Sequence, residues 1–270
     1  MSYDMNGKRA VVTGGGGAIL GAVARMLAGE GVSVAIWDLS LDQARERAEE
    51  ARGLGATAVA MACDVTSQES IRRALDTTMQ ELGGIDVLVN GAGGSRPQTT
   101  TSDGLSFFDI DPTEVGSVMD LNYLSIVMCC QEVGRVFAEQ GSGAVVNVTS
   151  VAGMTPLTRV PAYCNGKAAA NSFTQWLAVH MVQNYSATIR VNAVAPGFVL
   201  TEQNRFLLID KETGEMTTRG EQIMRAVPVA RYGTPEEVAE VVVFLTSDRA
   251  RFVNGAVIPV DGGFTAYSGV

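Results

Sequence analysis

Seven short segments of continuously apolar residues recur along this chain, and longer segments with helical periodicity separate them. Continuous hydrophobicity indicates strands buried on both faces, as in a parallel sheet between two helix layers. Strands that alternate with helices in this way form a doubly wound sheet with right-handed crossovers. The predicted strands are RAVVT (9–13), VSVAIW (32–37), ATAVAMAC (56–63), IDVLVN (85–90), AVVNVT (144–149), IRVNAVA (189–195) and AVIPV (256–260).

The predicted fold class is therefore α/β: a single-domain, Rossmann-type doubly wound sheet of about seven parallel strands with helices on both faces. The chain of 270 residues is long enough for one large domain, and no repeat, low-complexity tract or linker divides it. We expect one domain over residues 1–270. The polar segment 200–227 follows a strand at the edge where such sheets bind ligands, so we expect it to form a lid.

Composition narrows the partners and the location. Hydrophobic residues make up 46% of the chain and charged residues 18%, as is typical of a globular enzyme. The formal net charge is −9 without any lysine or arginine cluster, which argues against nucleic acid and an anionic membrane as partners. The start of the sequence lacks the features of a secretion signal, and no apolar segment has the length of a membrane span. We therefore expect a cytoplasmic protein.

Cysteine and histidine usage argues against several chemistries. Cys63, Cys129, Cys130 and Cys164 match no zinc or redox spacing, so we expect buried free thiols and no metal site. His180 is the single histidine, and we expect it to be structural. A mechanism that needs a catalytic histidine would depend on that residue alone.

A glycine-rich turn, TGGGGAILGAVARMLA, follows the first predicted strand. Glycines at such a turn let backbone N–H groups approach a pyrophosphate, and the helix N-terminus favours its negative charge. Asp38 ends the second strand, where a carboxylate accepts hydrogen bonds from a ribose diol and repels a 2′-phosphate. The motif therefore predicts a dinucleotide-binding domain that takes NAD rather than NADP. The same side chain could instead cap the next helix.

The segment PAYCNGKAAA (161–170) places Lys167 four residues after Tyr163. In a helix these side chains share one face, and an ammonium beside a phenol lowers the pKa of the phenol. Such a tyrosine could transfer protons. Taken alone, the pattern fits equally an amphipathic helix whose tyrosine packs and whose lysine reaches solvent.

Further motifs occur in a fixed order, and with them the chain resembles the short-chain dehydrogenase/reductase family over nearly its whole length. They are Thr13-Gly14 with the following glycines, Asp64-Val65, NGAG (90–93), Asn122 in DLNYLS, NVTS (147–150), Tyr163 thirteen residues after Ser150, and PGFVLT (196–201). The resemblance implies a homotetramer, to which the apolar helix 234–246 and the C-terminal tail could contribute interfaces.

The resemblance also implies an enzyme with the catalytic residues Asn122, Ser150, Tyr163 and Lys167. The implied cofactor-binding residues are Gly14, Gly16, Gly17, Ala18, Ile19, Asp38, Asp64, Val65, Asn90, Ala92, Gly93, Tyr163, Lys167, Pro196, Gly197, Val199 and Thr201.

The resemblance also implies a mechanism without a metal. Tyr163 exchanges a proton with the substrate oxygen while hydride moves to or from the nicotinamide. Lys167 lowers the pKa of Tyr163 and holds the nicotinamide ribose, and Ser150 orients the substrate oxygen. Asn122 steadies a water that links Lys167 to solvent.

The chain departs from the family pattern at two places. Ala18 and Leu20 stand where the glycine turn usually has glycines, and Gly91 stands where a second asparagine is expected. We expect cofactor binding to survive, either because Gly17 and Gly21 take over the close approach or because the pyrophosphate is slightly displaced.

Less generic segments indicate the substrate. GAGGSRPQ (91–98), FFDID (107–111), PLTRVPAY (156–163), TQWLAV (174–179), APGFVLTEQNR (195–205) and VDGGFTAYSGV (260–270) resemble a subgroup, the D-mannonate oxidoreductases or fructuronate reductases. The subgroup implies a sugar-acid substrate, D-fructuronate or D-mannonate. An anionic substrate needs local positive charge in so acidic a protein. The predicted substrate-binding residues are Arg96, Ser150, Arg159, Tyr163, Gln203, Asn204 and Arg205.

Three alternatives stay open. A polyol dehydrogenase would make the three arginines dispensable. A 3-oxoacyl-thioester reductase would be expected to have a basic entry surface and to use NADPH. A non-catalytic NAD-binding protein of the same fold would be expected to lack Tyr163, Lys167 or Ser150, and all three are present.

Overall fold

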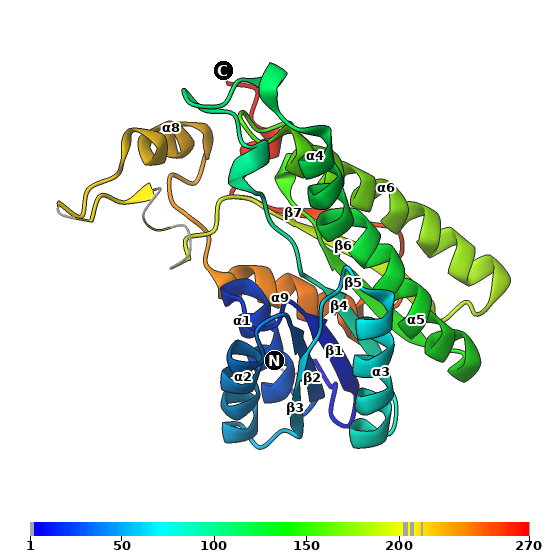
Figure 1. Ribbon diagram of the computed structural model, residues 1–270. Coiled ribbons are helices and arrows are strands. Elements are labelled where there is room, and N and C mark those ends of the chain that lie inside the picture. The colour runs from blue at the N-terminus through cyan, green and yellow to red at the C-terminus, as the bar shows by residue number, and fades with distance from the viewer. Residues whose placement is uncertain (1–2, 202–204, 206–207, 212, 270) are drawn as a thin grey trace.

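The computed structural model describes residues 3–201, 205, 208–211 and 213–269. Its strands form one seven-stranded parallel sheet in the order β3-β2-β1-β4-β5-β6-β7, which confirms the predicted fold class (Figure 1). Each predicted apolar segment forms one strand. The strands are β1 (Arg9–Thr13), β2 (Ser33–Asp38), β3 (Ala58–Ala62), β4 (Val87–Asn90), β5 (Gly143–Val148), β6 (Ile189–Pro196) and β7 (Val257–Val260).

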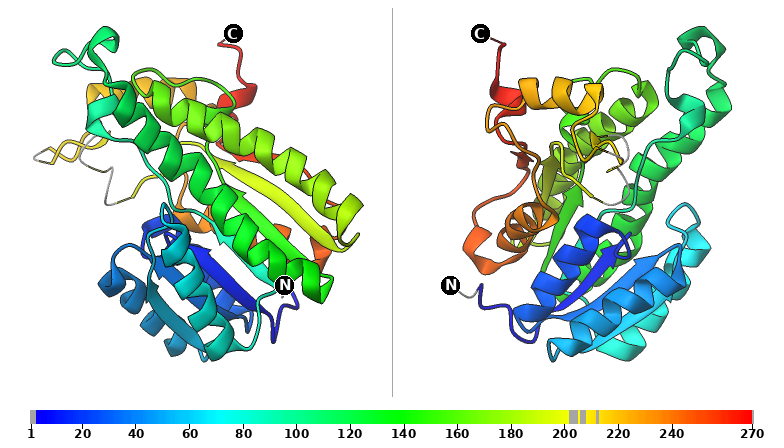
Figure 2. Two further views of the ribbon diagram at one scale, coloured as in Figure 1. Left: turned by 45° about the vertical axis from the view of Figure 1, so that its right-hand side comes forward. Right: turned by 90° about the vertical axis from the view of Figure 1, so that its left-hand side faces the viewer.

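Helices cover both faces of the sheet, which is why its strands are apolar throughout. One apolar core joins the sheet to α1 (Ala18–Gly29), α2 (Leu41–Gly53) and α9 (Pro235–Thr246). The other core joins it to α3 (Gln68–Leu82), α5 (Ser125–Gln140) and α6 (Pro161–Asn184). Figure 2 shows the long helices α5 and α6 side by side on this second face. In the described part of the chain, no helix has both the length and the apolarity that crossing a bilayer requires.

The strand order reverses at β1, which pairs with β2 on one side and with β4 on the other. The connections from β1 and β4 therefore leave the sheet toward opposite faces and open a crevice between them. Thr13 ends β1 and Asn90 ends β4 in register with it. The glycine turn and the NGAG segment consequently meet at the carboxyl edge of the sheet.

The predicted lid forms a small unit of its own. It includes an antiparallel bridge between Ile209 and Met216 and the helix α8 (Thr218–Ala226). Its buried residues Leu208, Ile223 and Val227 make a third apolar cluster. Figure 1 shows α8 apart from the sheet, at the same end of the molecule as α4 (Pro112–Met119) and the C-terminus.

Candidate active site

A cavity of about 720 Å³ lies along the carboxyl edge of the sheet. Residues that end or follow strands β1 to β6 line it, together with residues of the lid. Most of the predicted cofactor-binding residues are therefore brought together. Those that line the cavity are Gly14, Gly17, Ala18, Ile19, Asp38, Asp64, Val65, Ala92, Gly93, Tyr163, Lys167, Pro196, Gly197, Val199 and Thr201.

The glycine turn leaves the start of α1 open to the cavity. Gly14 has a φ of 66°, and a Cβ atom on it would lie 2.8 Å from the backbone of Ala92, so only glycine fits there. Gly17 is the N-cap residue of α1, and its N–H donates a hydrogen bond to Gly14 O at 3.1 Å. Glycine offers no side-chain acceptor, so the N-cap residue does not occupy the first amides of the helix. Because Ala18 and Ile19 also line the cavity, the first amides of α1 are placed to bind an anion.

Asp38 lines the cavity and also holds the turn together. Its Oδ2 accepts a hydrogen bond from the Gly16 N–H at 3.0 Å, and its Oδ1 accepts one from the Ser40 N–H at 2.9 Å. The cap of α2 is Ser40, whose side chain accepts from the Gln43 N–H. Asp38 is thus not the helix cap. Gly16 does not line the cavity, but its N–H donates the hydrogen bond that holds Asp38, which does line it.

Asn90 lies away from the cavity. Its Nδ2 donates to Asn147 Oδ1 at 2.9 Å, and Asn147 Nδ2 donates to Thr174 Oγ1 at 2.9 Å. This buried chain of side chains joins β4, β5 and α6. The Asn90 side chain therefore ties the sheet to the helix that carries Tyr163, and the structure does not bring it to the cavity.

Ser150, Tyr163 and Lys167 all line the same cavity. Ser150 follows β5, and its Oγ accepts a hydrogen bond from the Ala152 N–H at 3.1 Å. Tyr163 and Lys167 lie one turn apart at the start of α6, with Lys167 Nζ 5.7 Å from the centroid of the tyrosine ring. The Lys167 ammonium donates a hydrogen bond to Val148 O at 3.1 Å, which fixes the ammonium near the end of β5.

Burial dominates the electrostatics of this pair. It lowers the pKa of Lys167 from 10.5 to about 8, because the charged form loses hydration. Burial also raises the pKa of Tyr163, while a hydrogen bond with Ser150 lowers it. The expectation that Lys167 leaves this phenol with a lowered pKa is therefore not met in the protein alone, because desolvation is the larger effect.

The Asn122 side chain holds the segment after β4 by hydrogen bonds to its backbone. It sits in a π-helical turn, Asp120–Leu124, between α4 and α5. Its Nδ2 donates to Gly94 O at 2.8 Å and to Val118 O at 2.9 Å, and its Oδ1 accepts from the Gly94 N–H at 3.0 Å. A Cβ atom on Gly93 would lie 2.7 Å from Asn122 Oδ1 and 3.0 Å from Lys167 Nζ. Asn122 is fully buried beside Lys167 and does not line the cavity.

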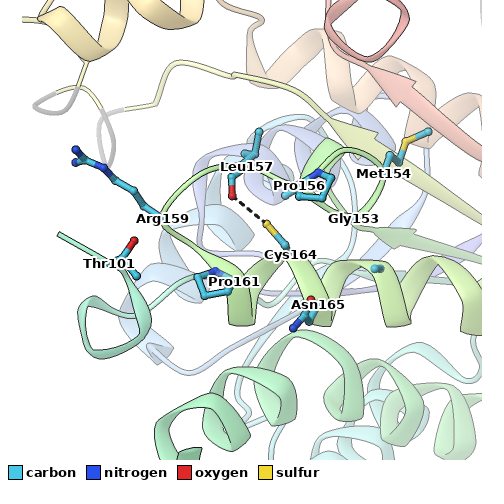
Figure 3. A pocket seen from close by; sticks show the side chains of 11 residues that line it. Thr101, Gly153, Met154, Pro156, Leu157, Arg159, Pro161, Cys164 and Asn165 are labelled. Atoms are coloured by element: carbon cyan, nitrogen blue, oxygen red, sulfur yellow. Dashed lines mark hydrogen bonds between the residues drawn. The ribbon is translucent and has the colours of Figure 1, made fainter. Parts of the chain in front are cut away.

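The predicted substrate arginines do not converge on the cavity. Arg96 lies 3.9 Å from the carboxylate of Glu114 and is 44% exposed. Arg159 lines a neighbouring cavity of about 540 Å³, and Figure 3 shows its side chain pointing away from Cys164. Arg205 is exposed and lines neither cavity. Gln203 and Asn204 lie outside the described residues.

The segment predicted to be a lid supplies residues that the sequence reasoning missed. Arg219 and Leu208 line the cavity from the lid, and Phe198 lines it from the segment after β6. Arg219 is half-buried and belongs to the first turn of α8. Its place within the predicted lid was the signal that could have identified it.

The four cysteines are buried free thiols, as expected from the sequence, and His180 lies outside the cavity. Burial raises the pKa of Cys63 to about 11 and that of Cys130 to about 12, which leaves both unreactive. His180 stacks on Trp176 with 4.7 Å between the ring centroids, on the outer side of α6.

Comparison with known proteins agrees with this geometry. Residues 17–265 match the family described as "Enoyl-(Acyl carrier protein) reductase". The chain is 38% identical to "Uncharacterized oxidoreductase UxuB" of Bacillus subtilis, over 99% of this chain and 98% of that protein. It is 33% identical to a D-threitol dehydrogenase of Mycolicibacterium smegmatis, over 97% of this chain and 95% of that protein.

A solved structure is similar over almost the whole chain. It is described as a "putative D-Mannonate oxidoreductase" from Haemophilus influenza with bound NAD. The TM-score is 0.92 and the sequence identity 36%, and the match covers 99% of this chain and 98% of that one. Fold, site geometry and these similarities together show that the protein belongs to the short-chain dehydrogenase/reductase family of oxidoreductases.

Proposed function

We propose that this protein is an NAD-dependent oxidoreductase that interconverts D-fructuronate and D-mannonate. The observation that carries the proposal is one cavity that contains the open N-terminus of α1 and, further along, Ser150, Tyr163 and Lys167. We also propose that residues 1–270 act as one domain and that the segment 200–227 is its lid. The relative of known structure that binds NAD supports the choice of cofactor.

The residues present fit a dinucleotide. The tight course of the glycine turn depends on the absence of a Cβ atom at Gly14, and the first amides of α1, which have no side-chain cap, present the positive end of the helix to the cavity. Asp38 keeps a carboxylate at the end of β2, where it can receive hydrogen bonds from a ribose and repels an added phosphate. Asp64 and Val65 would hold the adenine end, and Lys167 the nicotinamide ribose.

Tyr163 and Ser150 act on the substrate oxygen: one transfers a proton and the other donates a hydrogen bond. The bound cofactor supplies or accepts hydride. Tyr163 donates its hydroxyl proton to the carbonyl oxygen during reduction and takes a proton back during oxidation. Ser150 donates a hydrogen bond to the same oxygen and stabilises the charge that develops on it. Both side chains line the same cavity, and the Ser150 hydroxyl is close enough to lower the pKa of Tyr163, which supports their acting on one substrate oxygen.

Lys167 and Asn122 support this step. Ammonium charge beside the phenol favours phenolate and opposes the effect of burial on the pKa of Tyr163. Asn122 fixes Gly94 through both of its backbone groups and so holds the loop that borders Lys167. We propose that a water beside Asn122 connects Lys167 to solvent and returns the proton.

The sugar-acid substrate has two supports. The sequence segments that are least generic in the family resemble the D-mannonate oxidoreductases, and the similar solved structure carries that description. Arg219 gives the cavity a guanidinium outside the Tyr163–Lys167 pair, as an acid would require.

A polyol dehydrogenase is the second candidate. The similarity to D-threitol dehydrogenase favours it, and so does the position of Arg96 and Arg159 outside the main cavity. The two candidates differ in whether the substrate carries a carboxylate.

A substrate panel separates these functions. D-Fructuronate, D-fructose and a 3-oxoacyl thioester are incubated with NADH or NADPH, and absorbance of the reduced cofactor is followed. We expect NADH oxidation to be fastest with fructuronate and to fall by about 100-fold or more in Tyr163→Phe. The matched control is Tyr185→Phe, an exposed tyrosine that ends the same helix. Fastest turnover of fructose or of the thioester would contradict the proposal.

A further inference from the structure

The lid helix α8 contributes one cation to the cavity. The charged residues among the described cavity lining are Asp38, Asp64, Lys167 and Arg219. Asp38 ends β2 and Asp64 follows β3, at the end of the cavity assigned to adenosine, and Lys167 is assigned to Tyr163 and the nicotinamide ribose. Within that described lining, Arg219 is the remaining cation and the one guanidinium.

The contacts of α8 place Arg219 toward the reacting end of the cavity. A Cβ atom on Gly220, the next residue, would overlap the carbonyl oxygen of Leu208, so α8 packs closely on the chain at Leu208. After α8 the chain returns to the end of β7, where the Val229 N–H donates to Gly262 O at 3.3 Å. The rings of Phe198, after β6, and Phe264, after β7, lie 5.2 Å apart under this cluster. Ser150 follows β5, and strands β6 and β7 lie beyond β5 on the side away from β2 and β3.

Arg219 differs from the neighbouring arginines in that no ion pair with a carboxylate of the described residues holds it. Arg225 on the same helix lies 3.4 Å from Glu221, and Arg231 pairs with Glu237. None of the carboxylates in residues 3–201, 205, 208–211 and 213–269 lies within ion-pair distance of Arg219. A half-buried guanidinium that faces a cavity is matched by a carboxylate or a phosphate, either of which accepts two parallel hydrogen bonds, and the position of α8 near the ends of β6 and β7 favours the carboxylate of the substrate.

We propose that Arg219 binds the substrate carboxylate and so makes the enzyme select sugar acids over neutral sugars. This assignment depends on the proposed function. In fructuronate, three hydroxylated carbons separate the keto carbon from the carboxylate. A substrate whose keto oxygen meets Tyr163 and Ser150 therefore presents its carboxylate to a different part of the cavity. Arg219 lines the cavity from α8, on a segment separate from those that carry Tyr163 and Ser150, and we assign its guanidinium to that carboxylate.

The test compares two sugars that differ only at this group. D-Fructose has a hydroxymethyl group where D-fructuronate has the carboxylate. Steady-state reduction of both sugars by NADH is measured for the wild type and for Arg219→Gln. The matched control is Arg225→Gln, which removes a guanidinium that is 79% exposed on the same helix. We expect Arg219→Gln to lower kcat/KM for fructuronate by at least about 30-fold. Its kcat/KM for fructose and its KM for NADH should change by less than about twofold, and Arg225→Gln should change none of the three.

The failures are distinguishable. An increased KM for NADH in Arg219→Gln would show that this side chain binds the cofactor pyrophosphate and would overturn the assignment. Equal losses on both sugars, or full activity on fructuronate, would overturn it as well while leaving the proposed function intact. A wild-type enzyme that reduces fructose but not fructuronate would overturn the proposed function and this assignment together.

Discussion

The side chain of Leu20 occupies the space above Gly91. A Cβ atom built on Gly91 would overlap three side-chain carbons of Leu20, which is itself buried at the start of α1. Leu20 and Gly91 are two of the three positions, with Ala18, where the chain departs from the family pattern, and in the structure the absence of a side chain at Gly91 accommodates Leu20. Gly21 does not take over the close approach, because it faces the side chain of Arg47 on α2. Gly17 does line the cavity.

Leu20 and Gly91 should therefore behave as a coupled pair. Gly91→Ala alone should lower the free energy of unfolding by about 1–3 kcal/mol through overpacking. Leu20→Ala alone should lower it by about 2–5 kcal/mol, because it leaves a cavity. In the double variant the new methyl group occupies part of that cavity, so the loss should be smaller than the sum. Denaturant unfolding of the four proteins measures the coupling.

The control for the added methyl group is Gly53→Ala, at the end of α2, where a Cβ atom meets nothing within 4 Å. It should change the free energy of unfolding by no more than about 0.5 kcal/mol. Strict additivity of Leu20→Ala and Gly91→Ala would contradict the packing relationship.

Asn90→Ala should affect stability rather than cofactor binding. The substitution leaves Asn147 Oδ1 without the donor that it has at 2.9 Å, inside the buried chain that ends at Thr174. We expect a loss of about 1–3 kcal/mol in the free energy of unfolding. The KM for NAD should change by less than about twofold, because the side chain does not line the cavity. A large increase in that KM with unchanged stability would instead support the direct cofactor contact predicted from the sequence.

Asp38→Asn should change the selectivity between NAD and NADP. It keeps the shape of the side chain and removes the charge that disfavours a 2′-phosphate. The ratio of kcat/KM for NAD to that for NADP should fall by about tenfold or more, as measured from reduced-cofactor absorbance. Asp42→Asn on α2 removes a charge that is 94% exposed and should leave the ratio unchanged. An unaltered ratio in Asp38→Asn would show that Asp38 serves only the glycine turn.

Lys167 should make stability rise with pH. The pKa of this lysine is about 8 in the folded protein and near 10.5 when the chain is unfolded, because burial penalises the charged form. Between these values the unfolded chain binds a proton that the folded chain does not, so unfolding becomes harder as pH increases. The contribution should grow by about 2 kcal/mol from pH 8 to pH 10.

The measurement compares the wild type with Lys167→Met by denaturant unfolding at both pH values. The difference in unfolding free energy between the two proteins should shift in favour of the wild type at the higher pH. Titration of Tyr163 lowers the stability of both proteins near the top of this range, since burial raises its pKa. Removing the Lys167 charge raises that pKa further, so this loss is at least as large in Lys167→Met as in the wild type. A difference that does not depend on pH would show that Lys167 remains charged throughout.

The sequence by itself determined the architecture and the central chemistry. Continuous apolar segments gave all seven strands, because burial on both faces is a local property of each segment. The glycine turn, Asp38 and the Tyr163–Lys167 pattern could be picked out by residue type and spacing, whereas the resemblance to the family supplied Ser150 and the choice of a catalytic interpretation for the pair. These residues line one cavity because parallel strands bring their carboxyl ends to one edge.

Only the tertiary structure decided which polar side chains enter the cavity. Asn90 turns toward Asn147, Arg96 and Arg159 lie outside the main cavity, and Arg219 enters it from the lid. The direction of a side chain at a strand end or in a loop depends on packing between segments far apart in the chain, which a local pattern does not contain. The raised pKa of Tyr163 has the same origin, because desolvation is set by all the atoms that surround the group and not by its neighbours in sequence.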